Sequence, residues 1–423
     1  MQIRICKGAA LRGPAGIGDE NGGGNDMTIR EKIDNKKVLI WGYGLEGKSA
    51  KRFIETHCAP ARLEVFEGKQ SDLDEDAYDV IIKSPGIPTD HFNDKYTAAT
   101  DLFLSEFAPQ TIGITGTKGK STTSSLLYHI LKECSGRPVF LVGNIGVPCL
   151  DIYDDITPDS IIVFEMSCHQ LEHAYYSPHV AVMLNIYEDH LDRYGTKERY
   201  FEAKKNITLK QTAGDHFIVG DQVPQIKTDA KVWIIPFMGG PRFEMALKGS
   251  HNQINAFFAY VIAKDLYGCD DAALRASIAG FTGLRHRLEY IGNVGGIDFY
   301  DDSISTIPEA TIAAAKSVPN VHTLLIGGMD RHIDYDVLVG FIREHGELDY
   351  IFMYESGYRI YEDVKQYPNC VAVADLKAAV AEAKSRTPVG KACILSPAAA
   401  SYGYFKNFEE RGDVFAKLAL GNS

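Results

Sequence analysis

Short apolar segments alternate with helical segments along most of the chain, starting near Lys37. The first apolar segment, KVLIWGYG, ends in glycines, and a helical segment through residues 49–54 separates it from RLEVFEG and then DVIIKSPGIP. Strand, helix and strand at this spacing predict a parallel sheet of the doubly wound type.

The same alternation returns twice further along the chain. A second group opens at QTIGITGTKGKSTTSSLLYHILKEC and continues with SIIVFEMS and VAVMLNI, and a third contains GIDFYDD, HTLLIGG, YIFMYES and ACILSPA. We therefore expect an α/β protein with three domains, over residues 27–107, 108–283 and 284–423, the first and third of them Rossmann-like. Residues 1–26 are glycine-rich without apolar periodicity, and we expect a disordered leader there.

Composition narrows the class of protein. The chain has 423 residues, 45% hydrophobic and 24% charged, which is ordinary for a globular protein, and no apolar run is long enough for a membrane span. The formal charge of -12 disfavours binding of nucleic acid or anionic lipid by the surface as a whole. Eight scattered cysteines without a C-x-x-C pair indicate reduced thiols, and so a cytoplasmic protein.

A phosphate loop lies between the first strand and helix of the second group. It reads Gly116-Thr117-Lys118-Gly119-Lys120-Ser121-Thr122, although Ile114 stands where the longer form of the motif has its first glycine. Backbone N–H groups freed by glycine face phosphate oxygens, Lys120 reaches the outer phosphates, and the hydroxyl of Ser121 or Thr122 ligates magnesium. The motif predicts ATP and magnesium as cofactors and a central P-loop ATPase domain.

Polar side chains follow two later strands of the same group. Glu165 comes directly after four apolar residues, where a carboxylate would hold magnesium beside the phosphates. Asn185, Asp189 and His190 follow the next strand. The alternative for Glu165 is a strand end that meets water, and a single histidine such as His190 is as often structural as a ligand.

A second glycine loop follows the first strand of the chain. Gly42, Gly44 and Gly47 form G-x-G-x-x-G, and Glu67 ends the next strand, as in dinucleotide-binding sites. A nicotinamide oxidoreductase is therefore a rival hypothesis. The first domain is short for a complete dinucleotide fold, so we interpret the loop as holding a diphosphate or nucleotide head group; a glycine turn that only packs helix on strand is the third possibility.

Taken in order, these segments resemble the Mur ligases of peptidoglycan synthesis, most closely the glutamate-adding type. The resemblance extends from Lys37 to Leu420. It rests on GYGLEGKSA, SPGIP, GITGTKGKSTT, GNIG, FEMSCHQLE, LNIYEDHLDRY, GSHNQINA, FTGLRHRLE and LSPAAASYGYFKNFEERG. It implies that ATP phosphorylates the alanyl carboxylate of UDP-N-acetylmuramoyl-L-alanine and that the glutamate amine attacks the acyl phosphate.

The resemblance also implies a role for particular residues. The implied ATP-site residues are Gly116, Thr117, Lys118, Gly119, Lys120, Ser121, Thr122, Asn252, Asn255, Arg287 and Asp302. Those implied for the UDP-sugar are Gly42, Tyr43, Gly44, Leu45, Glu46, Ser84, Pro85, Gly86, Asn144, Ser167 and Gln170. The metal ligands would be Ser121, Thr122, Glu165, His190 and Lys204, with Lys120, Glu165, His190 and Lys204 catalytic. Glutamate would be bound by Thr306, Arg331, Ser401 and Phe408.

Lys204, in RYFEAKKN, matches a lysine that the family carbamylates, which turns a cation into an acidic oxygen ligand. A lysine on a polar helix is otherwise solvated, and Lys205, next in the sequence, is the alternative position for this lysine. Contributions from two domains to the nucleotide site imply that domain closure assembles it. The family also implies a monomer that works without nucleic acid or a membrane.

The glutamate pocket departs from the family pattern. Asp302-Ser303-Ile304-Ser305-Thr306 carries isoleucine where the D-glutamate enzymes carry lysine, while Arg331 occupies the position of another carboxylate-binding lysine. D-glutamate is the family default, and L-glutamate is the alternative that a rearranged pocket would favour. Further alternatives are a catalytically silent Mur-like nucleotide binder and, less compatible with the first domain, a folyl-polyglutamate or cyanophycin type ligase.

Overall fold

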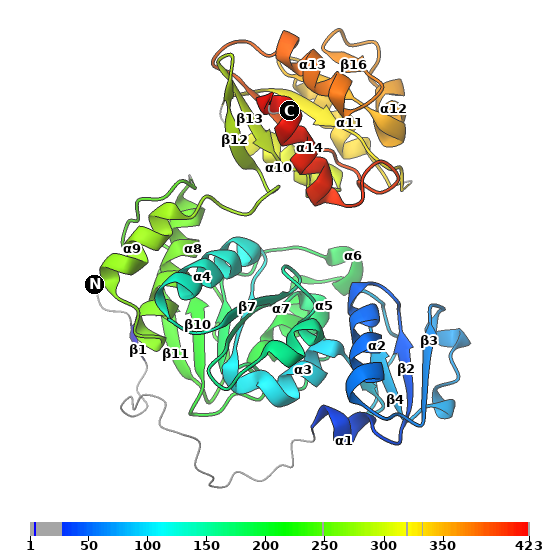
Figure 1. Ribbon diagram of the computed structural model, residues 1–423, viewed down its shortest axis with the longest axis vertical. Helices are drawn as coiled ribbons and strands as arrows, with labels where there is room; N and C mark the ends of the chain where they lie inside the picture. Colours follow the sequence, from blue (N-terminus) through cyan, green and yellow to red (C-terminus); the bar gives the residue numbers. More distant parts are fainter. Residues whose placement is uncertain (1–3, 6–27, 248, 319, 332, 422–423) are drawn as a thin grey trace. The chain divides into compact units, whose positions relative to one another are not determined.

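The computed structural model describes residues 4–5, 28–247, 249–318, 320–331 and 333–421 (Figure 1). The chain divides into two compact units, Met1–Phe281 and Thr282–Ser423. Most of the leader expected over residues 1–26 lies outside the described residues. Arg4–Ile5 form a short strand, β1, which the sequence pattern did not predict.

The N-terminal unit contains two sheets, and the first has four parallel strands in the order β3-β2-β4-β5. Its strands are β2 (Lys37–Trp41), β3 (Arg62–Phe66), β4 (Val80–Lys83) and β5 (Tyr96–Thr97). Its helical elements are α1 (Ile29–Ile33), α2 (Leu45–His57), η1 (Gln70–Asp72) and η2 (Glu75–Ala77). Thr28 and Glu31 form a capping box that starts α1, and α2 stands beside this sheet (Figure 1).

The second sheet has seven strands in the order β1-β11-β10-β9-β6-β8-β7, all parallel except β1. Its other strands are β6 (Thr111–Thr115), β7 (Val139–Gly143), β8 (Ile161–Glu165), β9 (Val180–Met183), β10 (His216–Gly220) and β11 (Lys231–Ile235). Strand β6 lies between β8 and β9, so the segments that leave the carboxyl ends of these three strands meet at one edge of the sheet.

Helices cover both faces of this second sheet. Along β8, Ile161 and Val163 pack with α4, α8 and α9, whereas Ile162 and Phe164 pack with α3 and η4 on the opposite face. Continuous apolar strands of this kind are typical of parallel sheets buried on two sides. The helical elements are α3 (Ala99–Phe107), η3 (Ala108–Gln110), α4 (Lys120–Cys134), η4 (Cys149–Asp155), α5 (Cys168–Leu171), α6 (Leu191–Tyr194), α7 (Lys197–Lys205), η5 (Asn206–Thr208), α8 (Ser250–Val261), the π-helix η6 (Ile262–Leu266) and α9 (Asp271–Gly280).

The C-terminal unit has one six-stranded sheet in the order β12-β13-β17-β14-β15-β16, parallel except for the β12–β13 pair. Its strands are β12 (Glu289–Val294), β13 (Ile297–Asp301), β14 (Val321–Ile326), β15 (Asp349–Phe352), β16 (Cys370–Ala372) and β17 (Ala392–Leu395). Its helices are α10 (Pro308–Ser317), α11 (Asp336–Glu344), α12 (Tyr354–Glu362), α13 (Leu376–Arg386) and α14 (Phe408–Leu420). Helices α11 and α12 pack on one face, and α13 and α14 on the other.

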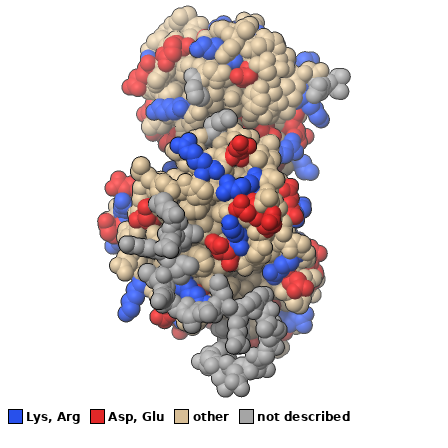
Figure 2. Space-filling view, turned by 90° about the vertical axis from the view of Figure 1, so that its left-hand side faces the viewer, with Lys and Arg blue, Asp and Glu red and all other residues tan. Residues whose placement is uncertain are grey.

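The predicted α/β class with parallel sheets is confirmed. Of the described helices, none is long and apolar enough to cross a membrane. On the face drawn in Figure 2, lysine and arginine side chains are interspersed with aspartate and glutamate. The two tryptophans, Trp41 on β2 and Trp233 on β11, are both buried in the N-terminal unit.

Candidate active site

The phosphate loop connects β6 to α4, as the motif predicted. Gly119 has a φ of +86° and immediately precedes Lys120, the first residue of α4. A Cβ atom at Gly119 would lie 2.5 Å from Asn255 Oδ1, so only glycine fits there. This contact also places Asn255, one of the two asparagines predicted for the ATP site, against the loop; its Nδ2 donates to Asn252 Oδ1 at 3.3 Å.

Asn185 holds the loop in shape from the end of β9. Its Oδ1 accepts hydrogen bonds from the backbone N–H groups of Thr117 (3.2 Å) and Lys118 (2.9 Å), and its Nδ2 donates to the Lys118 carbonyl at 2.9 Å. The sequence placed Asn185 near the loop but did not predict this role. A side chain that spans two loop residues in this way fixes the direction of their peptide groups before any ligand arrives.

Lys120 lies with its ammonium inside the loop. Its Nζ donates to the carbonyls of Gly116 (3.0 Å) and Thr117 (3.1 Å), and burial lowers its pKa. Ser121 is buried and Thr122 half-buried on the first turn of α4, whereas Lys118 is exposed and pairs with Asp189 at 3.4 Å. The Lys120 side chain therefore lies inside the loop, whereas that of Lys118 lies at the surface.

Glu165 ends β8 as a fully buried carboxylate. Its Oε1 accepts a hydrogen bond from Asn144 Nδ2 at 2.8 Å, and among the described residues its Oε2 has no hydrogen-bond partner. A buried carboxylate oxygen left unpaired is costly, and a bound cation would satisfy it. The donor set therefore fits magnesium, and Asn144 contacts the Glu165 carboxylate directly.

Lys204, on α7, is only 1% exposed. Its Nζ donates to Thr115 Oγ1 at 3.2 Å and lies 4.9 Å from the centre of the Tyr200 ring. Burial and, after it, the charge of Lys120 lower the pKa of Lys204 to about 7. The lysine is therefore not the solvated residue that a polar helix suggests, and its neighbour Lys205 instead pairs with Glu202 at the surface.

His190 follows β9 with its side chain exposed and its backbone at a φ of +52°, a conformation that non-glycine residues rarely adopt. Its ring lies 5.1 Å from that of His169 and 5.8 Å from that of Tyr200, centre to centre. Since Tyr200 and Lys204 share α7, the structure brings His190 and Lys204 to the same edge of the sheet.

The first glycine loop meets the segment after β4. Gly42 has a φ of +94°, and a Cβ atom there would lie 2.8 Å from Ser84 Oγ, which donates to the Gly42 carbonyl at 3.1 Å. Tyr43 and Pro85 are half-buried, Gly44 and Gly86 are exposed, and Leu45 is 79% exposed. These residues therefore form one surface at the carboxyl edge of the first sheet.

Glu46 connects this loop to α5. Its Oε1 accepts a hydrogen bond from Gln170 Nε2 at 2.8 Å, while Gln170 and Ser167 form the capping box that starts α5. Burial raises the pKa of Glu46. Three residues predicted for the UDP-sugar site are thus brought together from both sheets of the N-terminal unit.

Two basic residues at this edge were not predicted from the sequence. Lys83 ends β4, is buried, and has its pKa lowered to about 8 by that burial. Arg193 pairs with Glu172 at 2.6 Å and donates to the Gly86 carbonyl at 3.1 Å. Lys83 could have been predicted from its position at the end of an apolar strand. No feature of the sequence pointed to Arg193.

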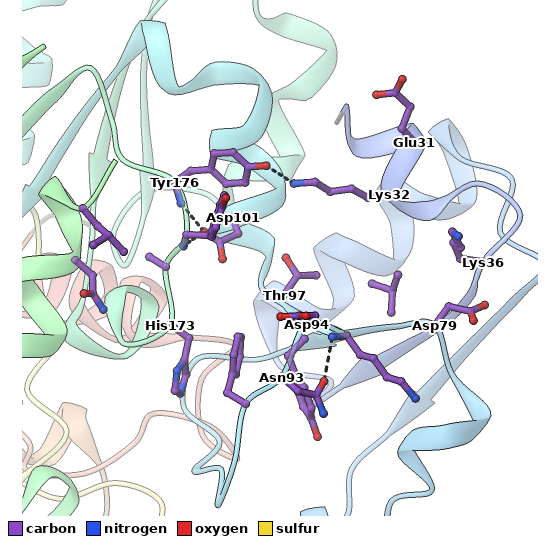
Figure 3. Close-up of a pocket in the computed structure, with 18 residues that line it drawn as sticks. Glu31, Lys32, Lys36, Asp79, Asn93, Asp94, Thr97, Asp101, His173 and Tyr176 are labelled. Carbon is purple, nitrogen blue, oxygen red and sulfur yellow. Dashed lines mark hydrogen bonds between the residues drawn. The ribbon is translucent and has the colours of Figure 1, made fainter. Parts of the chain in front are cut away.

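A cavity of about 710 Å³ lies at the opposite, amino-terminal edge of the first sheet (Figure 3). Lys36, Asp79 and Lys95, which come just before three of its strands, line it on one side. On the other side Asp101 accepts hydrogen bonds from the backbone of Tyr175 and Tyr176, and burial raises its pKa to about 6. None of the residues predicted from sequence lines this cavity.

In the C-terminal unit the predicted glutamate residues leave three neighbouring strands, β13, β17 and β14. Arg331 is exposed and its Nη2 donates to the Thr306 carbonyl at 2.9 Å, while Ser401 is buried. Phe408 is half-buried, and its carbonyl accepts a hydrogen bond from Ser303 Oγ at 2.8 Å. The structure therefore joins Thr306 to Arg331 directly and places Ser401 on the adjacent loop.

The two nucleotide residues predicted in this unit differ. Arg287 is exposed, whereas Asp302 is buried and accepts hydrogen bonds from Ser305 Oγ (2.6 Å), Ser396 Oγ (2.8 Å) and the Leu288 N–H (3.1 Å). Burial raises the pKa of Asp302 to about 6. The side chain of Asp302 is thus already hydrogen-bonded within the C-terminal unit.

Arg411, which was not predicted from the sequence, is fully buried beneath these loops. It donates to the carbonyls of Ser303 (2.7 Å) and Ala399 (3.0 Å). Burial lowers its pKa to about 10. Its guanidinium therefore ties the loop after β13 to the loop after β17.

Comparison with known proteins places the chain in a family. The sequence model of the Mur ligase middle domain matches residues 114–238. The chain is 33% identical to a UDP-N-acetylmuramoyl-L-alanine–L-glutamate ligase of Salinispora tropica, covering 91% of this chain and 97% of that protein. It is 31% identical to a UDP-N-acetylmuramoylalanine–D-glutamate ligase of Lacticaseibacillus casei, covering 90% and 95%. In structure it is similar to MurF ligase from Thermotoga maritima in complex with ADP, with a TM-score of 0.55, 18% identity and coverage of 93% and 97%. The chain belongs to the Mur ligase family.

Proposed function

We propose that this protein is an ATP-dependent amide ligase that adds glutamate to UDP-N-acetylmuramoyl-L-alanine, a step in the synthesis of peptidoglycan precursors. Relatives that bear this activity in their names cover nearly the whole chain. The observation that carries the proposal is the buried group around the phosphate loop. There Lys120, Glu165 and Lys204 are close enough for the charges of the other two to affect the pKa of Lys204.

The reaction proceeds in two steps. An oxygen of the alanyl carboxylate attacks the γ-phosphorus of ATP, the bond to the β-phosphate oxygen breaks, and ADP leaves. The glutamate amine then attacks the carbon of the acyl phosphate, loses a proton, and the tetrahedral adduct expels phosphate to leave an amide. Positioning and neutralisation of charge supply most of the rate in such transfers.

Lys120 and the N–H groups of the phosphate loop would hold the phosphates of ATP. Within the described residues the Lys120 ammonium donates to two backbone carbonyls, and these are contacts it can exchange for phosphate oxygens. The +86° φ of Gly119 and the bonds made by Asn185 orient the loop beforehand. The α4 N-terminus adds its dipole to the same site.

Ser121 or Thr122, Glu165, His190 and Lys204 are the residues that would hold magnesium. Bound there, the ion supplies positive charge to the transferring phosphoryl group. The unpaired Oε2 of Glu165 supports this assignment. Asn144 keeps the other oxygen of Glu165 oriented, which leaves Oε2 as the free ligand.

We propose that Lys204 carries a carbamate. Its amine nitrogen attacks carbon dioxide, loses one proton, and becomes a carbamate with one negative charge. The reaction needs a neutral amine, and a pKa of about 7 provides that form near neutral pH. The product replaces a buried cation by an oxygen ligand of the kind magnesium prefers.

The first glycine loop, the Ser84–Gly86 turn, Asn144, Ser167 and Gln170 would bind the UDP-sugar. Lys83 would add a cation for its diphosphate. In the C-terminal unit Arg287 and Asp302 are proposed for the nucleotide, and Thr306, Arg331, Ser401 and Phe408 for glutamate. We place the reaction in the cytoplasm and propose a monomer; the seven cysteines in the described part of the chain are all free.

Both glutamate isomers remain candidates. D-glutamate is the family default, while Ile304 removes a cation and the named relatives include ligases for each isomer. The test is phosphate release by the purified protein with ATP, magnesium and UDP-N-acetylmuramoyl-L-alanine, with D-glutamate, L-glutamate or neither. Release that depends on one isomer assigns the stereochemistry. No release with either isomer would contradict the ligase proposal and favour a silent nucleotide binder.

A further inference from the structure

Three side chains that bind soft metals lie beside the proposed magnesium site. Cys168 and His169 open α5, directly after the segment that follows β8, and His190 follows β9. One ligand atom from each lies within 4.8 Å of the other two. Cys168 Sγ is 3.9 Å from His169 Nδ1, and the two histidine rings are 5.1 Å apart, centre to centre.

This spacing is close to that of a tetrahedral zinc site. With Zn–S near 2.3 Å and Zn–N near 2.0–2.1 Å, tetrahedral geometry puts sulfur and nitrogen about 3.6 Å apart. The observed sulfur to nitrogen distance of 3.9 Å exceeds this only slightly. A modest movement of the exposed His190 side chain would complete a set of three ligands.

The donors differ in kind from those proposed for magnesium. Magnesium selects oxygen ligands, whereas a thiolate with two imidazoles selects zinc and similar ions. The Cys168 thiol forms no disulfide, and stacking against the Tyr194 ring orients the His169 ring. The Tyr194 hydroxyl, 3.1 Å from His169 Nδ1, would give up that nitrogen when the ion binds.

We propose that Cys168, His169 and His190 form a Zn²⁺ site with three protein ligands. Because His190 is exposed, water can occupy the fourth position. The His190 ring lies 5.8 Å from that of Tyr200, whose hydroxyl donates to Thr117 Oγ1 at 3.3 Å, so the site borders the phosphate loop.

A consequence for catalysis rests on the proposed function. His190 is a proposed magnesium ligand there, and one imidazole nitrogen cannot ligate two ions. Zn²⁺ held by Cys168 and His169 therefore withdraws His190 and lowers ligase activity. Activity would return when a chelator removes the zinc.

The site is tested by titrating the full-length protein with Co²⁺, which reports a thiolate ligand by a charge-transfer absorption band, and then displacing it with Zn²⁺. The wild-type protein should give the band. Cys168→Ser should lose it and bind Zn²⁺ at least about tenfold more weakly, equivalent to about 1.4 kcal/mol. His169→Gln, at a half-buried position, should also weaken Zn²⁺ binding and serves if the serine variant does not fold.

The matched control is Cys58→Ser, which removes a half-buried thiol at the end of α2 and should leave the band and the Zn²⁺ affinity unchanged. Equal Co²⁺ spectra and equal Zn²⁺ affinity for wild type and Cys168→Ser would overturn the proposal. Phosphate release is measured separately, without added zinc. A protein that gives the Co²⁺ band but never releases phosphate would support the zinc site and contradict the ligase function. A protein that releases phosphate without giving the band would support the ligase function and contradict the zinc site.

Discussion

The phosphate-loop region of the N-terminal unit and the predicted glutamate region of the C-terminal unit are both built on neighbouring parallel strands, yet their polar groups differ. Around the phosphate loop, Glu165 has an oxygen with no partner among the described residues and Lys204 has a pKa lowered to about 7. In the C-terminal unit, Asp302 accepts three hydrogen bonds within its own fold. A buried carboxylate oxygen without a partner, as in Glu165, indicates where a cation binds, whereas a carboxylate bonded within its own unit, as in Asp302, supports the loops around it.

Among the variants that test this contrast, Lys120→Ala should have the largest effect on phosphate release. The variant should lower kcat/KM for phosphate release by about 10²–10³-fold, because a charge that faces the transferring phosphate is lost. Its melting temperature should stay close to that of the wild type, since the hydrogen bonds that Lys120 makes in the described part of the chain go to two backbone carbonyls of its own loop. Lys132→Ala, at an exposed position of the same helix, is the control; turnover retained in Lys120→Ala would contradict the phosphate-loop assignment.

Lys204→Ala should be nearly as severe, with a loss of about 10²-fold. Short carboxylates such as acetate should restore part of the activity by replacing the carbamate oxygens. Wild-type activity should also fall as the pH drops below about 7, because the protonated amine does not react with carbon dioxide. Lys205→Ala, next in sequence but paired with Glu202 at the surface, should remain active. Full activity in Lys204→Ala would exclude the carbamate.

A smaller effect is expected in the glutamate region. Arg331→Ala should raise KM for glutamate about fivefold and leave KM for ATP unchanged, since an exposed ion pair contributes about 1 kcal/mol. Arg331→Lys should recover part of the loss because it keeps the charge. Arg343→Ala, exposed on α11, is the control. An unchanged KM for glutamate in Arg331→Ala would remove this residue from the site.

The smallest effect concerns stability of the C-terminal unit. His286 Nδ1 and Asp301 Oδ2 lie 2.7 Å apart in a buried pair; burial lowers the pKa of His286, but the hydrogen bond and charge of Asp301 outweigh it, so the pKa is raised. The protonated pair therefore stabilises the unit fully at pH values below the unfolded pKa of histidine, and the stabilisation is lost as pH rises through the folded pKa.

His286→Gln should flatten this dependence and, if the lost bond contributes about 1 kcal/mol, lower the melting temperature by about 2–4 °C at pH 6. Circular dichroism melts between pH 5.5 and 8 would measure it. Identical pH profiles for the two proteins would show that this pair does not set the stability of the unit.

Much of the fold followed from the sequence because the strands are short, apolar and separated by helices. KVLIW, IIVFE and ACIL all form strands, and the phosphate loop joins β6 to α4 as its glycines require. Strands β7, β10 and β11 were not predicted, because their place in the sheet depends on pairing with strands from other parts of the chain.

The candidate site was predictable only where residue type and position coincided. Glu165 could be inferred because a carboxylate follows an apolar strand. The burial of Lys204 could not, since α7 reads as a polar helix and only packing against Tyr200 and Thr115 encloses the amine. Likewise Arg411 looks like an exposed helix residue until the loops that it supports are folded around it.

The placement of the two tryptophans gives the protein a built-in optical asymmetry. Trp41 and Trp233 are both buried in the N-terminal unit, and the chain has no other tryptophan. Tryptophan fluorescence therefore reports the unfolding of the N-terminal unit, while the C-terminal unit contributes no tryptophan signal. Recording fluorescence and far-ultraviolet dichroism on one sample would therefore resolve whether the two units melt together or one after the other, without a label or a truncated chain.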